Sequence, residues 1–171
     1  MDLGSLCRMH PRLPVDMAAV MIGRAALGLQ NQKHSPGATL HMVVEDQHHM
    51  ATLLWPLTAP EVGLQHDDKK ITEEGAEAIA LAMTHEMQGW RIYRRLQEKQ
   101  HGDWLLERPV GTKFERIPVE VSGVAKGGIT NRVREKLKQV GRNTEYAECC
   151  ATVVGFEKPE ASMQMAGRRV R

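Results

Sequence analysis

The sequence is poor in cysteine and in aromatic residues, and it has no long apolar run. The three cysteines, Cys7, Cys149 and Cys150, are odd in number and lack the spacing of zinc ligands, so reduced thiols are favoured over a disulfide framework. Aromatic residues make up only 4% of the chain, which argues against a platform that stacks single-stranded bases. No segment approaches the roughly 18 apolar residues of a membrane span, and residues 1–14 lack the apolar stretch of a secretory signal. We therefore expect a cytoplasmic protein without membrane contact.

What is present is an ordinary globular composition. The 171 residues are 42% hydrophobic and 26% charged, which predicts a single domain over residues 1–171 with its own core. Residues 1–15 and 159–171 carry no clear periodic pattern, and we expect them to be loose termini.

Charge is divided unevenly along the chain. Residues 1–90 contain 6 Lys and Arg against 11 Asp and Glu, a net charge of −5, whereas residues 91–142 contain 13 against 6, a net charge of +7. A basic segment of this kind attracts a polyanion and is the electrostatic footprint of nucleic-acid binding. The alternative is a solvated basic face without a partner.

The first half predicts a helix, a hairpin and a second helix. Residues 17–30 read as a helix with Asp16 as its N-cap, residues 40–44 and 50–55 as the strands of a hairpin, and residues 71–88 as a helix that ends at Gly89. The hairpin carries His41, His48 and His49 beside Glu45 and Asp46. Their spacing matches no known metal site, so solvated side chains are favoured over ligands.

The second half predicts three strands, a helix and a last strand. The strands are expected at residues 90–96, 101–106 and 117–123, the helix from a cap at Thr130 or Asn131 to about residue 140, and the last strand at residues 146–156. In the helix Val133, Leu137 and Val140 form one apolar stripe, and we expect it to face the sheet. The basic residues around it, which we expect to face solvent or phosphate, are Arg132, Arg134, Lys136 and Lys138.

Two of the strands carry carboxylates that can hold a metal. Asp103 lies on the first of them and Glu120 at the centre of the next. A hard cation such as Mg²⁺ or Mn²⁺ takes oxygen ligands, often one or two carboxylates with water and substrate phosphate, so the layout suits phosphodiester hydrolysis. The alternative is that both are solvated strand residues.

From residue 71 onward the predicted order is helix, strand, strand, strand, helix, strand. In this order, and in Asp103 followed by Glu120-Val121-Ser122, the chain resembles the restriction-endonuclease-like (PD-(D/E)xK) superfamily. The resemblance covers roughly the last hundred residues and implies a mixed α/β sheet flanked by helices, with Asp103 and Glu120 binding Mg²⁺ or Mn²⁺. It also implies a helix glutamate at the site, either Glu77 or Glu73. The strings Thr72–Glu77 and Val119–Gly123 are similar to an uncharacterised bacterial family as well.

The chain departs from the superfamily pattern at one position. Ser122 stands where the superfamily has a lysine that helps to activate or orient the attacking water. Other members bring this cation from elsewhere, and Lys113 or Lys126 are candidates here, with Ser122 left to hydrogen-bond water or a phosphate oxygen.

Two functions therefore stay open. The first is a metal-dependent nuclease of defence or repair, with Asp103, Glu120, Ser122 and Glu77 at its active site and the four basic helix residues on the nucleic-acid backbone. The second is a non-catalytic subunit of the same fold that binds nucleic acid or protein, including a second copy of itself. A lysine ammonium close to Ser122 in the folded chain favours the first.

Overall fold

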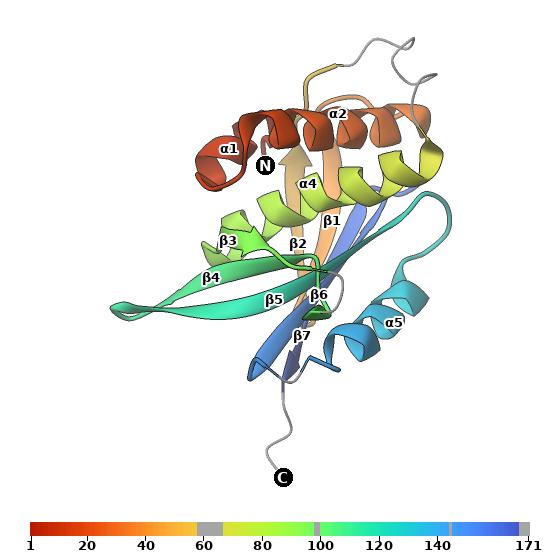
Figure 1. Cartoon of the computed structure of the whole chain (residues 1–171). Helices are drawn as coiled ribbons and strands as arrows, with labels where there is room; N and C mark the ends of the chain where they lie inside the picture. Colours follow the sequence, from red (N-terminus) through yellow and green to blue (C-terminus); the bar gives the residue numbers. More distant parts are fainter. Residues whose placement is uncertain (58–66, 98–99, 144, 168–171) are drawn as a thin grey trace.

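A seven-stranded mixed sheet flanked by helices makes up the fold (Figure 1). The computed structural model describes residues 1–57, 67–97, 100–143 and 145–167. The strands are β1 (Ala38–Val44), β2 (Gln47–Leu53), β3 (Arg91–Arg95), β4 (Trp104–Val110), β5 (Lys113–Val124), β6 (Glu148–Gly155) and β7 (Glu160–Gly167), in the spatial order β2-β1-β7-β6-β5-β4-β3. The expected α/β class is confirmed.

The helices lie on both faces of the sheet. They are the short η1 (Leu3–Ser5) and α1 (Leu6–Met9), then α2 (Val15–Asn31), α4 (Asp68–Gln88) and α5 (Thr130–Val140). Neighbouring residues of β6 divide between the two layers, because Cys150 packs in the core with α2 and α4 whereas Cys149 and Ala151 pack with Val140 of α5. None of the helices in the described part of the chain combines the length and apolarity that a bilayer crossing requires.

From α4 to β6 the order is helix, strand, strand, strand, helix, strand, as expected. Strands β3, β4 and β5 form an antiparallel meander, and α5 then connects β5 to a parallel β6. The predicted hairpin is present as antiparallel β1 and β2. The predicted stop of α4 is also present, since Gly89 adopts the left-handed conformation with φ 68°.

Two predicted helix caps are wrong. Asp16 lies inside the first turn of α2, whose cap position is held by Pro14, and its carboxylate still suits the positive end of the helix. Helix α5 begins after Ile129 and has no side-chain cap, so neither Thr130 nor Asn131 has that role.

The expectation of loose termini is also wrong. Residues 160–167 form β7, which lies inside the sheet between β1 and β6. Residues 161–163 are buried on both faces of the sheet. Because small residues such as Ala161 and Ser162 occupy these positions, the sequence shows no alternation of apolar and polar residues that would predict a strand. Residues 168–171 lie outside the described residues.

The N-terminal segment is anchored by a buried histidine. Leu3 and Leu6 are fully buried, and so is His10. The Ile92 N–H donates to Nδ1 of His10 at 3.1 Å, so Nε2 carries the proton and donates to the Leu81 carbonyl at 3.0 Å. The neutral ring thus joins the N-terminal segment to α4 and β3.

Two glycines in the strings Thr72–Glu77 and Val119–Gly123 allow close backbone contact. A Cβ on Gly75 would lie 2.9 Å from the backbone N of Ala25 in α2, and one on Gly123 would lie 2.2 Å from the carbonyl oxygen of Thr72. The start of α4 therefore rests directly on β5 at Gly123, on the face of the strand opposite to Ser122.

The first prediction tests this contact. Gly123→Ala places a methyl group against the Thr72 carbonyl and should lower the free energy of unfolding by about 1 to 3 kcal/mol, measured by urea denaturation. Gly128→Ala is the matched control, because a Cβ there meets nothing within 4 Å. Equal stabilities of the two variants would show that α4 does not lie on β5 at Gly123.

The second prediction concerns His10. Burial is the main cause that lowers the pKa of His10 from 6.5 to about 4, with His85 and Arg91 adding to it. Because the unfolded chain takes up a proton at higher pH than the folded chain, stability should fall as the pH drops from about 6.5 to about 4. NMR titration should find the ring neutral with its proton on Nε2 down to about pH 4. A pKa close to 6.5 would contradict the burial of this segment.

Candidate active site at the start of β4 and the centre of β5

Asp103 and Glu120 are brought together by the pairing of β4 with β5. Trp104 pairs with Val119, which places Asp103, the residue before β4, beside Glu120. The backbone N–H of Val121 donates to Oδ2 of Asp103 at 2.7 Å, and the Asp103 N–H donates to the Val119 carbonyl at 2.9 Å. The Asp103 carboxyl group is therefore held against the backbone on either side of Glu120.

The surroundings of Asp103 disfavour its charge. Burial, followed by repulsion from Glu120, raises the pKa of Asp103 from 3.8 to about 7. The Val121 N–H opposes this shift, and Glu77 adds to it. Within the described residues no cation forms an ion pair with Asp103, and the Lys136 ammonium, which also opposes the rise, offsets its charge only in part. A proton or a bound cation would balance the rest.

Glu120 has a protein cation of its own. Lys136 of α5 points back at the sheet, and its Nζ lies 2.5 Å from Oε1 of Glu120. The side chains of both residues are buried, with only 6% of Glu120 and 14% of Lys136 exposed. Gln139 also accepts a hydrogen bond from the Lys136 ammonium, at 3.0 Å.

Ser122 lies next to this ion pair on the same face of β5. Its Oγ accepts a hydrogen bond from Nε of Arg132 at 2.8 Å, and Arg132 also pairs with Glu135. Ser122 is 5% exposed. Two basic residues of α5 thus hold the helix onto the two polar residues of β5.

Glu77 approaches from α4 on the other face of the sheet. Arg95 donates to both of its carboxylate oxygens, at 2.9 and 3.1 Å, and the Trp104 indole N–H donates at 3.1 Å. Burial raises the pKa of Glu77, and the Arg95 guanidinium opposes that rise. Arg95 also lies over the Trp104 ring, 4.8 Å from its centroid. The other helix candidate, Glu73, is exposed and lies 3.8 Å from Lys69.

The predicted orientation of the α5 basic residues is half right. Arg134 and Lys138 are exposed, as expected. Lys136 instead turns inward, whereas Arg132 bonds Ser122 and stays 44% exposed. With Val140 these two residues form a stripe at four-residue spacing that faces β5 and β6. Val140 is fully buried, Leu137 packs beside it, and Val133 is only half-buried.

Neither lysine suggested as the missing cation lies at the site. Lys113 is at the turn between β4 and β5, and Lys126 is exposed in the loop after β5. The lysine whose ammonium reaches Glu120 is Lys136, and we did not predict this contact from the sequence. The available signal was its four-residue spacing from Arg132 and Val140. Arg95 and Trp104, the partners of Glu77, carry no such signal.

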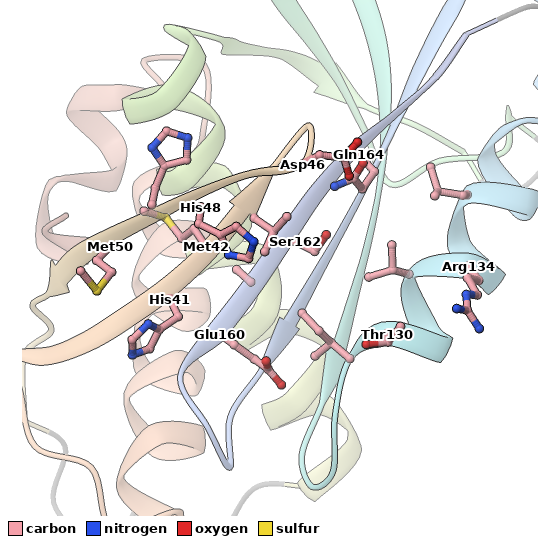
Figure 2. A pocket seen from close by; sticks show the side chains of 16 residues that line it. His41, Met42, Asp46, His48, Met50, Thr130, Arg134, Glu160, Ser162 and Gln164 are labelled. Carbon is pink, nitrogen blue, oxygen red and sulfur yellow. The ribbon is translucent and has the colours of Figure 1, made fainter.

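A cavity of about 670 Å³ lies apart from these carboxylates, on the other side of α5 (Figure 2). Its floor is formed by β1, β2 and β7 and its far wall by α5. His41 and His48 line it, while His49 also borders a second, smaller cavity. Within the described residues no group of three His, Cys, Asp or Glu side chains is placed to hold a metal.

Asp103 and Glu120 together supply two carboxylate groups, which are part of the ligand set that a hard cation requires. Both ligand groups are carboxylates, and the repulsion between them is what a divalent cation would relieve. Mg²⁺ usually keeps several waters and binds one or two carboxylates, so two protein ligands are sufficient. No family model, curated protein or solved structure matches this chain.

The third prediction concerns Asp103 in metal-free buffer. Because its folded pKa of about 7 lies above 3.8, the parent should lose stability as the pH rises between these values. Asp103→Asn cannot ionise, and its amide oxygen can still accept from Val121. It should therefore be more stable than the parent at pH 8, by on the order of 1 kcal/mol, and equal to it near pH 4.

Asp46→Asn is the control, since it removes an exposed carboxylate and should change stability little. The measurement is urea denaturation of both variants over this pH range. Lower stability of Asp103→Asn at pH 8 would contradict the described surroundings of Asp103.

Proposed function

We propose that the chain is a metal-dependent, nuclease-like domain that hydrolyses the phosphodiester backbone of nucleic acid. One support is the order of elements from α4 to β6, with Asp103 before β4, Glu120 inside β5 and Glu77 on the preceding helix. This is the arrangement of the superfamily that the sequence resembles. A setting in defence or repair, in the cytoplasm, is a further prediction from that resemblance.

The observation that carries the proposal is the position of Lys136. Its ammonium lies at Glu120, two residues from Ser122, where the superfamily pattern has a lysine on the strand. The side chain comes from α5 instead of β5, yet it brings the same charge to the same pair of carboxylates. A buried ammonium beside a carboxylate is suited to hold an attacking water or a phosphate oxygen.

Asp103 and Glu120 would hold Mg²⁺ or Mn²⁺. Such a cation lowers the pKa of bound water and offsets the charge that builds up on phosphate. Lys136 forms an ion pair with Glu120, and the Val121 N–H orients Asp103. Glu77, fixed by Arg95 and Trp104, adds negative charge near Asp103 and so favours a cation there.

Arg134 and Lys138 are the residues we assign to the nucleic-acid backbone. Both are exposed on α5, the helix that carries Lys136. Lys136, which we also expected to bind the backbone, is held by Glu120, so we assign it to the site. Arg132 bonds Ser122 but is 44% exposed, so it can also contact the backbone.

The second candidate is a non-catalytic subunit that binds nucleic acid or a protein partner. The observation in its favour is that Glu77, Glu120 and Ser122 each already have a cationic partner within the domain. A polar network that is satisfied internally can serve to orient α5 and the sheet without any reaction. Asp103 is the member that this alternative leaves unexplained.

The fourth prediction separates the two candidates. Mg²⁺ or Mn²⁺ should raise the free energy of unfolding of the parent, by about 2.7 kcal/mol at roughly 100 times the Kd. Asp103→Asn and Glu120→Gln should lose this gain and also lose cleavage of DNA or RNA. Lys136→Met should reduce cleavage by at least about 100-fold.

Lys70→Met is the control, because it removes an exposed lysine of α4 that the proposal does not use and should keep metal binding and cleavage. A parent with neither metal stabilisation nor cleavage of single- or double-stranded DNA or RNA would remove the nuclease proposal. The non-catalytic subunit would then replace it.

A further inference from the structure

The outer end of the β4–β5 hairpin is a ribbon of two strands only. Pairing of β4 with β3 ends at Glu107, and pairing of β5 with β6 begins at Val119. Residues 108–116, here called the hairpin end, therefore pair only with one another and project past the rest of the sheet (Figure 1). An isolated two-stranded ribbon is marginally stable in water, so a covering surface would stabilise it.

The tip of the hairpin end is apolar. Val110 is 45% exposed and Phe114 is 64% exposed. The arginines behind them are already neutralised, since Arg108 pairs with Glu115 and Glu148, and Arg116 lies over the Tyr93 ring beside Glu107. Within the described residues Lys113 has no ion pair. The hairpin end thus presents apolar side chains with one free cation, which suits a protein groove better than phosphate.

The same chain contains a groove with the complementary character. The 670 Å³ cavity of Figure 2, here called the sheet groove, has apolar walls that include Val43 of β1 and Val133 and Leu137 of α5. Asp46 and Glu160 line it, and in the described part of the chain neither forms an ion pair. Arg134 alone offsets them, so the sheet groove is net negative when its histidines are neutral.

The hairpin end and the sheet groove cannot meet within one molecule. The groove is built on β2, β1 and β7 at one end of the sheet, whereas β4 lies beyond β6 and β5 towards the other end. We propose that the hairpin end of one copy docks in the sheet groove of a second copy, with Phe114 and Val110 against its apolar walls and Lys113 facing Asp46 and Glu160. This proposal does not depend on nuclease activity.

Docking of this kind joins unlike surfaces. Two copies that exchange hairpin ends reciprocally close as a dimer, while one-way contacts build rings or chains. In either case the exposed apolar side chains of the hairpin end, Phe114 and Val110, are buried against the sheet groove and lose their contact with water.

Sedimentation velocity of the full chain across micromolar concentrations tests the proposal. The parent should associate, and Phe114→Asp should weaken association by about tenfold or more. Lys113→Glu and Asp46→Lys should each weaken association. The variant with both changes should recover it, because the two positions again carry charges of opposite sign. Val15→Asp, a change at a 74% exposed residue of α2, should leave association unchanged.

Circular dichroism checks that each variant is folded, which is expected because every changed side chain is exposed. A parent that is monomeric at every concentration would overturn the proposal. So would association that is insensitive to Phe114→Asp, or a charge swap that fails to recover it. If Phe114→Asp leaves the mass unchanged but weakens nucleic-acid binding, the hairpin end contacts nucleic acid and not a second copy.

Discussion

Withdrawal of three carboxyl groups from water around β4 and β5 is the constraint on which the rest of the site depends. Glu77 lies on the α4 face of the sheet and Glu120 on the α5 face. Each buried carboxylate needs a cation, a proton or strong donors, because desolvation of an unpaired charge is costly. Glu77 is paired with Arg95 and Trp104, and Glu120 with Lys136. Helix α5 has only one fully buried residue, Val140, so its place on the sheet relies on Lys136 and Arg132 as well as on apolar packing.

Asp103 is the member of this group for which the described residues supply no ion pair. The Val121 N–H and the Lys136 ammonium favour its charge, but burial, Glu120 and Glu77 outweigh them. We therefore expect a purely structural network to be more stable with an asparagine at this position. A cation site needs a carboxyl group at this position even if that group lowers the free energy of unfolding. Such a loss of stability is typical of functional positions.

The sequence was sufficient for the features that arise from local pattern. The stop of α4 at Gly89, the first hairpin and the order of elements from α4 to β6 all follow from periodicity and turn residues. The strand β7 was missed because its small residues, such as Ala161, show no alternation, and the N-terminal segment because His10 finds its partners in α4 and β3. Glu77, Asp103 and Glu120 were predicted as site residues, but the contacts of Glu77 with Arg95 and of Glu120 with Lys136 are tertiary. The four-residue spacing of Lys136 indicates which face of α5 it shares and not which residue it contacts.

Electron paramagnetic resonance of Mn²⁺ tests the central claim most directly, because it counts bound ions without relying on activity. The account predicts one Mn²⁺ per chain in the parent, displaced by Mg²⁺, and markedly weaker binding in Asp103→Asn. The exposed control Asp46→Asn should bind as the parent does. Absence of bound Mn²⁺, or equal binding by the parent and Asp103→Asn, would contradict a cation site at Asp103 and Glu120.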